Sequence, residues 1–340
     1  MRTIIPVIHH FDDRYATPAA VSMLTMLEQA DPAFDYDLRV VHSGVSLEHQ
    51  MMLEELVDRF PNATLKFVLP KSVTEVAETF RATRTKAHFS LDMYWTLLVP
   101  DLFPDIDIAI ITDVDVLWKG DIARLWHVAT DADDGSWQLA GIRDVRPVAH
   151  TWLADLMAKY RDEFDDVEYG HIEEGVGAGL LVANLSRMRE AGTTAEFLDS
   201  LQQNLHRLRL PEQDVINLVA HSVTRTLPLE FLVCTHVYEL YGGSGTVVDD
   251  KRYSSSEIQH ALENPVQLHF AGKHRMKPWL NPRAPFAEEW IEALARTNFL
   301  QEWLGDETNP RFWEKKRLLA SFPVPFRSLR RIDIIWRALD

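Results

Sequence analysis

Short apolar runs and longer mixed stretches alternate along the first 70 residues of the chain. Runs rich in β-branched residues predict strands at residues 3–8, 38–41 and 65–69. The stretches between them predict helices at residues 19–29 and 47–60. Strands that alternate with helices in this way are typical of a mostly parallel sheet with helices on both faces. The pattern therefore predicts an α/β fold.

A polar loop, residues 9–15, joins the first predicted strand to the first predicted helix. Thr17 before Pro18 marks the start of that helix, and Ser46 marks the start of the second. Open α/β sheets bind ligands at the carboxyl ends of their strands, so this loop is expected to border a nucleotide site. Because the loop lacks a Gly-rich phosphate cradle, a metal ion is expected to neutralise the phosphate charge.

The run at residues 108–118 combines a buried strand with two acidic side chains. It begins with apolar and β-branched residues, and Asp113 and Asp115 follow them. In an extended chain, side chains two positions apart point the same way, so the two carboxylates converge on one point. Carboxylate oxygens at the end of a strand suit a hard divalent cation such as Mg²⁺ or Mn²⁺ that also binds substrate phosphates. We therefore expect a metal–diphosphate site here.

The Asp-x-Asp spacing is weak evidence by itself because this acidic chain contains it elsewhere. The other pairs are Asp35 and Asp37, Asp105 and Asp107, and Asp131 and Asp133. They lie at the starts of apolar runs or in a polar loop, so solvated turns are expected for them. For Asp113 and Asp115, a turn at the end of the strand is the alternative to metal binding.

The rest of the chain continues the same pattern. Strands are predicted at residues 139–143 and 180–184 and before His269, and helices at residues 89–98, 122–127, 152–164, 193–208 and from Pro211 onward. The first of these helices is expected to stop before Pro100. Residues 162–174 are acidic and are expected to form a mobile loop. The polar residues there, His171, Glu173 and Glu174, are therefore interpreted as solvated side chains and not as a second metal site.

Glycines and basic side chains stand next to two of these later strands. Gly175, Gly177 and Gly179 precede one strand, where they fit either a close approach of the backbone to a ligand or a tight turn. The other strand delivers His269, a candidate third metal ligand, although a lone histidine at a strand end is more often only a satisfied polar residue. It is followed by Gly272 and by four side chains that suit a diphosphate clamp, Lys273, His274, Arg275 and Lys277.

The composition narrows the class of protein. The chain has 340 residues, 46% of them hydrophobic, which is enough for one large α/β domain with an appendage or for two domains. Its net charge of −16 and pI of about 5.3 argue against a nucleic-acid partner. A single cysteine, Cys234, excludes an internal disulfide framework and fits a reducing compartment. Apolar runs are too short for a membrane span or a signal peptide, so the cytoplasm is the expected location.

The C-terminal segment differs in charge from the acidic body. Residues 311–340 hold eight Lys or Arg residues against three acidic residues. Apolar side chains such as Phe326, Ile332 and Trp336 fall on one face of a predicted helix. A basic amphipathic helix of this kind suits an anionic membrane surface and would hold the protein peripherally on the inner face of the cell membrane. The alternative is a terminal helix packed on the body, with its Arg residues paired to surface acids.

Five blocks of the sequence together resemble the family 8 retaining glycosyltransferases. They follow the family's order and are Phe11-Asp12-Asp13-Arg14-Tyr15, Thr112-Asp113-Val114-Asp115-Val116-Leu117 with Gly120-Asp121-Ile122 and Leu125-Trp126, Ala178-Gly179-Leu180-Leu181-Val182-Ala183-Asn184-Leu185, Glu212-Gln213-Asp214-Val215-Ile216-Asn217, and His269 with Gly272 and Lys277-Pro278-Trp279. Each block is weak alone, but five in the right order are specific. The resemblance implies that residues 1–282 form a GT-A domain, which is Rossmann-like with a mostly parallel central sheet flanked by helices. Residues 283–340 would then be a helical C-terminal appendage.

The resemblance also implies a UDP-sugar donor, from which a hexose is moved with retention to a saccharide or lipid-linked acceptor in lipopolysaccharide or other cell-surface polysaccharide synthesis. Asp113, Asp115 and His269 would hold Mn²⁺ or Mg²⁺. The donor would contact Asp12 and Tyr15 at the uracil and ribose, Val114 near the ribose, Asp144 and Ala178 beside the sugar, and Gly272 and Lys277 at the diphosphate. Gln213 would lie near the anomeric carbon, and Glu212, where the family usually has Asp, is the second candidate catalytic residue. Because an amide is a poor nucleophile, front-face attack by the acceptor hydroxyl is expected instead of a covalent intermediate.

Three features depart from the family pattern. Gly177 replaces a polar residue that usually precedes Ala178, and Thr96 replaces an Arg in the helix before the Asp113 strand. About two extra residues separate Gly272 from Lys277, which leaves three alternatives for the diphosphate contact, Lys273, His274 and Arg275. These departures bear on the identity of the sugar more than on the type of reaction.

Two other functions stand as alternatives. A phosphohydrolase of the haloacid-dehalogenase type also uses Asp-x-Asp after a strand, but there the motif normally ends the first strand of the fold. Here several strand–helix units precede Asp113. A non-catalytic relative that only binds sugar nucleotides is allowed by Gly177 and Thr96.

Overall fold

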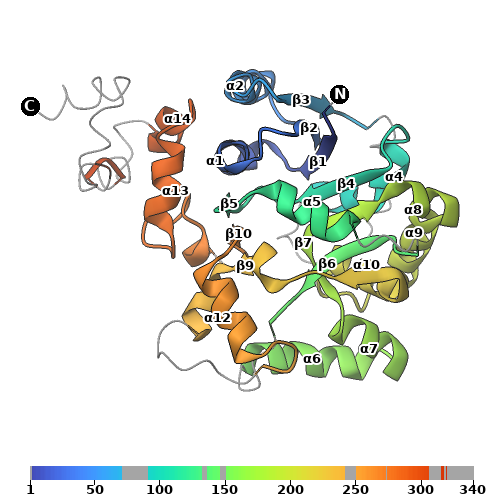
Figure 1. Ribbon diagram of the computed structural model, residues 1–340. Coiled ribbons are helices and arrows are strands. Elements are labelled where there is room, and N and C mark those ends of the chain that lie inside the picture. Colours follow the sequence, from blue (N-terminus) through green and yellow to red (C-terminus); the bar gives the residue numbers. More distant parts are fainter. Residues whose placement is uncertain are drawn as a thin grey trace, which may run out of the picture.

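The computed structural model describes residues 2–70, 91–131, 136–145, 151–241, 250–272, 274–305, 315–317 and 319. Within them, one sheet has the strand order β3 (Ala63–Val68), β2 (Asp35–Val41), β1 (Ile4–His10), β4 (Ile108–Thr112), β7 (Val176–Asn184), β6 (Leu139–Arg143) and β8 (Thr224–Thr226) (Figure 1). β7 runs antiparallel to both of its neighbours, and the other strands share one direction. The predicted α/β fold with a mostly parallel central sheet is therefore confirmed.

The strand order reverses between β1 and β4, and open α/β sheets form their ligand-binding crevice at the carboxyl ends of such strands. From β1 the chain adds β2 and β3 on one side, and then returns to add β4 on the other side. The parallel register pairs Ile8 with Ile111, so His10 and Asp113, two residues further along each strand, leave the sheet at the same level.

A second, smaller sheet extends this edge. It consists of β5 (Val116–Trp118), β10 (Gln267–His269) and β9 (Val233–Cys234), with β10 in the middle. β10 runs antiparallel to β5 and parallel to β9. Because β5 directly follows the Asp113–Asp115 turn, this sheet brings residues near position 269 back to the end of β4.

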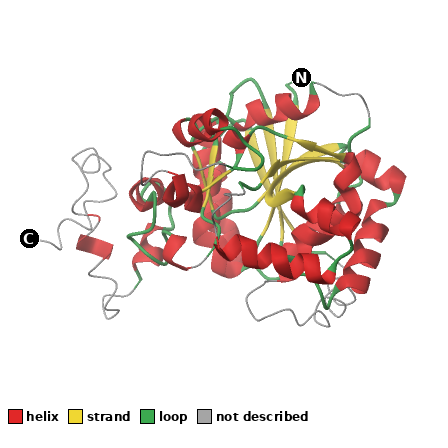
Figure 2. Ribbon diagram, turned by 90° about the horizontal axis from the view of Figure 1, so that it is seen from below, coloured by secondary structure: helices red, strands yellow, loops and turns green. Residues whose placement is uncertain are grey.

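Helices cover both faces of the central sheet (Figure 2). Val7 of β1 faces one apolar core, and the next residue, Ile8, faces the other. The first core is covered by α1 (Ala16–Gln29), α2 (Leu47–Val57), α5 (Ile122–Thr130), α11 (Thr235–Tyr241), α12 (Ser255–Glu263), α13 (Ala287–Leu294) and α14 (Leu300–Leu304). The second is covered by α4 (Val99–Leu102), α6 (Thr151–Glu163), α7 (Asp166–Glu173), α8 (Leu185–Ala191), α9 (Thr193–Asn204) and α10 (Pro211–Ala220).

Two predicted helix boundaries are wrong because short 3-10 helices precede the α-helices. The 3-10 helix Asp13–Tyr15 runs directly into α1, so the helix begins at Ala16, before Thr17. Pro18 then lies in the first turn, where its missing N–H is not needed. Likewise, the 3-10 helix Leu91–Leu98 continues into α4, and Pro100 stands in the first turn of α4 instead of ending a helix. Ser46 does cap α2, as predicted.

The acidic stretch at residues 162–174 is helical and not a loop. Asp165 caps α7 by accepting hydrogen bonds from the N–H groups of Val167 and Glu168, and the Glu168 side chain bonds back to the Asp165 N–H. This capping box and the acidic first turn favour a helix despite the charge. Asp35 and Asp37 also lie in a regular element, β2, and not in a turn, and Asp37 pairs with Arg39.

The C-terminal helices pack against the N-terminal part of the chain. Trp290 of α13 and Phe299 before α14 are fully buried in the first core, and Arg296 pairs with Glu28 of α1. The division of the chain after residue 282 stays a prediction. In the described part of the chain, no helix is long and apolar enough to span a bilayer.

Most of the basic C-terminal segment, residues 311–340, lies outside the described residues, so its predicted amphipathic helix stays a prediction. Three of its basic residues are described, Lys315, Lys316 and Arg317, and the first two pack on the body. Lys315 lies over the ring of Trp303, 4.5 Å from its centroid, and bonds to the Trp303 carbonyl. Lys316 is buried. Lys315 and Lys316 therefore do not belong to an exposed basic face, whereas Arg317 is exposed.

Candidate active site

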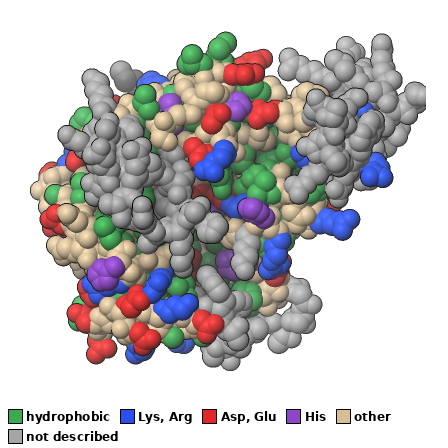
Figure 3. Space-filling model, turned by 180° about the vertical axis from the view of Figure 1, so that it is seen from behind, with side chains coloured by type: hydrophobic (Ala, Val, Ile, Leu, Met, Phe, Trp, Pro, Cys, Tyr) green, Lys and Arg blue, Asp and Glu red, His purple; other side chains and the backbone are tan. Residues whose placement is uncertain are grey.

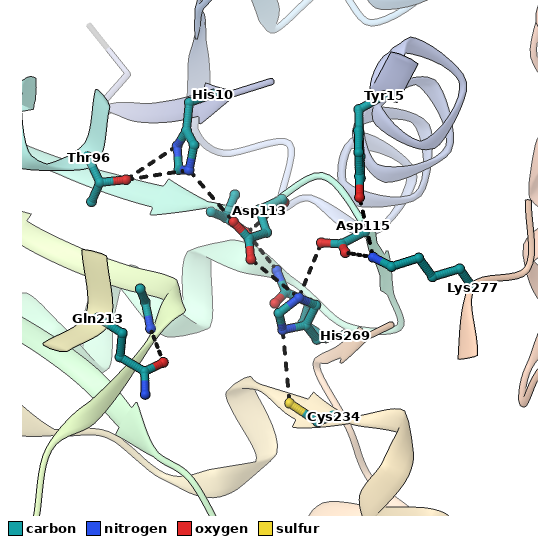
Figure 4. Close-up of polar contacts among 12 residues, drawn as sticks. His10, Tyr15, Thr96, Asp113, Asp115, Gln213, Cys234, His269 and Lys277 are labelled. Atoms are coloured by element: carbon teal, nitrogen blue, oxygen red, sulfur yellow. Dashed lines mark hydrogen bonds and ion pairs between the residues drawn. The ribbon is translucent and has the colours of Figure 1, made fainter. Parts of the chain in front are cut away.

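Three side chains from distant parts of the sequence meet at the carboxyl end of β4. Asp113 and Asp115 stand on the turn between β4 and β5, and His269 ends β10. Nε2 of His269 lies 3.3 Å from Oδ2 of Asp113 and 3.2 Å from Oδ1 of Asp115 (Figure 4). One ligand atom from each residue lies within 4.8 Å of the others. The three predicted ligands are thus placed so that they can hold one metal ion.

Backbone pairing fixes this arrangement. His269 pairs with Val116 across β10 and β5, and the Phe270 N–H donates to the Asp115 carbonyl at 2.9 Å. On the β4 side, the buried Gln267 amide donates to the Thr112 hydroxyl at 2.9 Å. The turn that carries the two carboxylates is therefore held at both ends by β10.

Gly179 of β7 gives the three side chains the space they need. A Cβ at position 179 would lie 2.8 Å from Cε1 of His269 and 3.0 Å from Oδ2 of Asp113. The Asp113 N–H donates to the Gly179 carbonyl at 3.0 Å. Two carboxylates and an imidazole are a donor set that divalent cations such as Mn²⁺ accept. The residues present therefore fit a divalent metal.

Lys277 adds a positive charge to the same group. Its Nζ lies 2.7 Å from Oδ2 of Asp115 and 3.4 Å from the Tyr15 hydroxyl. Burial by itself would raise the pKa of Asp115, but the charges of His269 and Lys277 outweigh burial and hold this pKa below its usual range. Asp115 is thus an ionised, mostly buried carboxylate that lies between His269 and Lys277. On the face seen in Figure 3, basic, acidic and histidine side chains gather in a hollow near its middle.

The loop after β1 borders this group. Asp12 caps the 3-10 helix that follows it and pairs with Arg14. The Tyr15 ring packs edge-on against Trp279, with centroids 6.0 Å apart. Val114 is buried in the turn between the two aspartates. Gly272, after β10, has a φ of 100°, a conformation that other residues rarely adopt.

The residues predicted to lie beside the donor sugar form a second group, between β6, β7 and α10. The Ala178 N–H donates to Oε1 of Gln213 at 3.3 Å, and Nε2 of Gln213 donates to Oδ2 of Asp144 at 3.4 Å. A Cβ at Gly177 would contact Oδ1 of Asp144 at 3.3 Å. The structure thus brings Asp144, Ala178 and Gln213 together, and Gly177 allows Asp144 to approach.

Glu212 lies deeper than Gln213, and 94% of its surface is buried, since its exposed fraction is 6%. Among the described residues, its Oε1 has no hydrogen-bond partner. Burial, followed by the negative charge of Asp113, raises the pKa of Glu212 well above its usual value, against a hydrogen bond from Thr96. Burial and the nearby charge of Asp113 thus favour the protonated form of Glu212.

Sequence reasoning did not predict His10 or Cys234 as site residues, yet His10 lies next to Asp113 and Cys234 lies next to His269. Nε2 of His10 lies 3.8 Å from Oδ1 of Asp113, and its ring nitrogens lie 3.4 and 3.5 Å from the Thr96 hydroxyl. Cys234 Sγ lies 4.0 Å from Nδ1 of His269. His10 could have been predicted from its position at the carboxyl end of the first strand, because folds of this type bind their ligands at that edge of the sheet.

Among the alternatives for the diphosphate contact, Arg275 points elsewhere. Its guanidinium makes a two-pronged ion pair with Glu239, at 2.8 and 2.9 Å. Lys273 lies outside the described residues. Among the described basic residues of this segment, Lys277 is the one that reaches Asp115 and Tyr15.

Comparison with known proteins identifies the family. Residues 6–282 match the sequence model of glycosyl transferase family 8. The chain belongs to this family. The predicted class of enzyme, a glycosyltransferase, is that of the family, and the alternative of a haloacid-dehalogenase-type phosphohydrolase is wrong.

Individual relatives are more distant. The chain is 24% identical over 192 residues to lipopolysaccharide 1,2-glucosyltransferase of Escherichia coli (strain K12), a match that covers 56% of this chain and 50% of that protein. The chain thus spans about half of this curated relative. Among solved structures, WbbM bifunctional glycosyltransferase superposes with a TM-score of 0.67 at 25% identity, covering 91% of this chain and 52% of that one. The galactosyltransferase LgtC, solved with donor and acceptor sugar analogues, has a TM-score of 0.66 at 20% identity and covers 88% of this chain and 99% of its own.

Proposed function

We propose that this protein is a metal-dependent retaining glycosyltransferase that moves a hexose from a UDP-sugar to a saccharide or lipid-linked acceptor. The observation that carries the proposal is the convergence of Asp113, Asp115 and His269 on one point, with Lys277 beside them, at the reversal of the strand order. Membership of family 8 supports the reaction class. The match to a lipopolysaccharide glucosyltransferase supports lipopolysaccharide or another cell-surface polysaccharide as the product.

The donor is proposed to lie across the crevice, with its diphosphate beside the three metal ligands. Asp12 and Tyr15 bind the uracil and ribose from the loop after β1, and the Val114 backbone approaches the ribose. Gly272 and Lys277 bind the diphosphate, and Lys277 already points at the metal-binding group. Asp144 and Ala178 border the sugar, where both contact Gln213.

Departure of UDP is the step that needs most electrostatic help. A bound Mn²⁺ or Mg²⁺ supplies a Lewis acid that stabilises the charge on the leaving diphosphate. Lys277 contributes a fixed positive charge at the same place, which matters more in a buried site than in water. Only 12% of the Lys277 side chain is exposed. The ammonium is therefore already in place beside the leaving group and does not have to move in from solvent during the reaction.

The polar groups near the sugar favour front-face attack by the acceptor hydroxyl. The Gln213 amide oxygen is occupied by the Ala178 N–H, and an amide is a poor nucleophile. Burial and the charge of Asp113 raise the pKa of Glu212 and favour its protonated form, and Asp214 is turned toward Tyr160 and the N–H groups of Arg209 and Leu210. None of the three is prepared to form a covalent bond to the sugar. A trapped glycosyl adduct on Glu212 or Asp214 would overturn this part of the proposal.

The test of the function is release of UDP from a panel of UDP-hexoses in the presence and absence of Mn²⁺. We expect slow hydrolysis of one donor that requires the metal and falls about 100-fold or more in Asp113→Asn. The alternative, a non-catalytic sugar-nucleotide-binding relative, predicts heat of binding in calorimetry with no turnover of any donor. Binding of no UDP-sugar at all would contradict both functions.

We further propose that the basic C-terminal segment holds the enzyme at an anionic membrane on the inner side of the cell, close to a lipid-linked acceptor. Residues 311–340 have more basic than acidic side chains, whereas the whole chain has a net charge of −16, and this local positive charge supports the proposal. Flotation with anionic liposomes is expected to bring up the whole chain at low salt, and less of the double variant Arg330→Glu, Arg331→Glu. Equal behaviour of the two proteins would count against membrane binding.

A further inference from the structure

Lys277 forms an ion pair with Asp115, which is also one of the three candidate metal ligands. Its ammonium lies 2.7 Å from Oδ2 of Asp115, while Oδ1 of the same carboxylate faces His269. The exposed fractions of the Lys277 and Asp115 side chains are 12% and 13%, so water screens this pair little. One carboxylate is thus bound on one oxygen by a permanent cation and offered on the other to the candidate metal.

Aromatic residues hold the ammonium in this place. Nζ lies 5.0 Å from the ring centroid of Trp279 and 5.6 Å from that of Tyr15, both within cation–π range. Trp279 is itself packed against Phe270 and Trp290, and its carbonyl accepts a hydrogen bond from the Trp303 indole. Because this support comes from several buried rings, the ammonium cannot withdraw from Asp115 without loss of contacts.

A divalent cation held by Asp113, Asp115 and His269 would share Asp115 with this ammonium. Like charges so close together in a shielded site repel strongly. The repulsion is relieved when a diphosphate enters, because its negative oxygens can be shared between the two cations. The same lysine therefore opposes the metal when it is alone and favours the metal when it comes with a diphosphate.

We infer that Lys277 is a built-in competitor for Asp115 that makes the site accept its metal together with the nucleoside diphosphate and not before it. This inference rests on the proposed function, because it assumes that the site binds both ligands. It adds an order of binding and a residue that sets the order. Because such a coupling is reciprocal, the presence of Lys277 should also make bound metal raise the affinity for the diphosphate by the same factor by which the diphosphate raises the affinity for the metal.

The test is the affinity for Mn²⁺, followed by the electron paramagnetic resonance of the free ion, with and without UDP. The native protein is expected to bind Mn²⁺ weakly alone and at least tenfold more tightly with UDP. Lys277→Met is expected to bind Mn²⁺ alone about tenfold more tightly than the native protein, and to gain less from UDP. Lys277→Arg, which keeps the charge, is expected to bind Mn²⁺ alone as weakly as the native protein.

A matched control separates the contact from a change in net charge. Lys66 is 60% exposed on β3 and pairs with Asp37, so Lys66→Met removes the same charge far from the crevice and should leave Mn²⁺ affinity unchanged. The inference is overturned if Lys277→Met binds Mn²⁺ alone no more tightly than the native protein or the Lys66 variant. It is also overturned if Lys277→Arg behaves like Lys277→Met. Failure of the native protein to bind Mn²⁺ even with UDP would instead contradict the proposed function.

Discussion

His10 and Asp113 face each other across the carboxyl ends of β1 and β4, with Nε2 of His10 3.8 Å from Oδ1 of Asp113. The other oxygen of Asp113 faces His269. Asp113 thus stands between two histidines, one on the central sheet and one on the small sheet (Figure 4). Since the Thr96 hydroxyl contacts the ring nitrogens of His10, we infer that His10 is held in place to orient the Asp113 carboxylate.

Replacement of His10 should therefore weaken metal binding without removing a ligand. We expect His10→Ala to lower the affinity for Mn²⁺, measured with UDP present, by about tenfold to 100-fold, the usual cost of losing a residue that orients a ligand. His127→Ala is the matched control because His127 is half exposed on α5. An unchanged affinity in His10→Ala would show that Asp113 does not need this support.

The space left by Gly179 gives a second prediction. Gly179→Ala places a methyl group 2.8 Å from the His269 ring and 3.0 Å from Asp113, so either the ligands or β7 must move. We expect a stability cost of about 1–3 kcal/mol in urea unfolding, together with a loss of Mn²⁺ affinity. Gly170→Ala is the control, because a Cβ there meets nothing within 4 Å and the residue lies in α7. That variant should be more stable by roughly 0.5–1 kcal/mol, and equal metal affinity in both variants would contradict the prediction.

Local patterns were enough to predict a mostly parallel sheet with helices on both faces, and part of the site. The apolar run before Asp113 predicted a buried strand, and extended geometry predicted that Asp113 and Asp115 converge. His269 could be only a candidate from residue patterns, because its partners are some 150 positions away and are reached through the pairing of β10 with β5. The family resemblance implied that His269 joins the two aspartates, but not the strand pairing that brings it there.

Other features could not be read from the sequence because they depend on tertiary packing. His10 contacts Asp113 only because β4 inserts beside β1, and Cys234 reaches His269 only through the β9–β10 pair. The helix α7 was missed because its negative charge suggested a loop, whereas the capping box of Asp165 and Glu168 stabilises a helix. Charge composition alone therefore did not predict this helix, because the capping box at its N-terminus stabilises it.

Asp214 gives a prediction on pH. Its carboxylate accepts hydrogen bonds from the N–H groups of Arg209 and Leu210 and from the Tyr160 hydroxyl, at 2.7, 2.9 and 2.8 Å. Burial nevertheless raises its pKa to about 6. An aspartate in an unfolded chain has a pKa of about 3.9, so the folded state binds this proton more tightly and loses stability as the pH rises between these values. The loss is on the order of 3 kcal/mol and is complete above the higher pKa.

We therefore expect Asp214→Asn, which keeps the acceptor oxygen but cannot ionise, to lack this part of the pH dependence. Urea unfolding between about pH 4.5 and pH 7 measures it, because the midpoint reports the change in stability at constant slope. Asp107→Asn is the control, since the Asp107 side chain is 86% exposed. Parallel pH profiles of the native protein and Asp214→Asn would contradict the assignment.

His49 of α2 joins the loop after β1 to the C-terminal helix α14. Its Nδ1 lies 2.7 Å from Oδ1 of Asp13 and its Nε2 lies 3.0 Å from Oε2 of Glu302, while its ring packs on Phe299. Asp13 also accepts a hydrogen bond from the Ser46 N–H at 2.7 Å. Burial by itself would lower the pKa of His49, but the bond to Asp13 and the charge of Glu302 outweigh burial and raise it.

A histidine whose pKa is raised by folding stabilises the protein fully below its ordinary pKa of about 6.5, and this contribution is lost as the pH rises through the higher pKa of the folded state. We expect the melting temperature of His49→Gln to lie below that of the native protein by about 1–2 °C near pH 6 and to approach it at higher pH, since half-exposed pairs contribute less than about 1 kcal/mol. His206→Gln provides a histidine outside this contact as a control. A gap between native protein and His49→Gln that is the same at every pH would mean that His49 acts through packing on Phe299 and not through its charge.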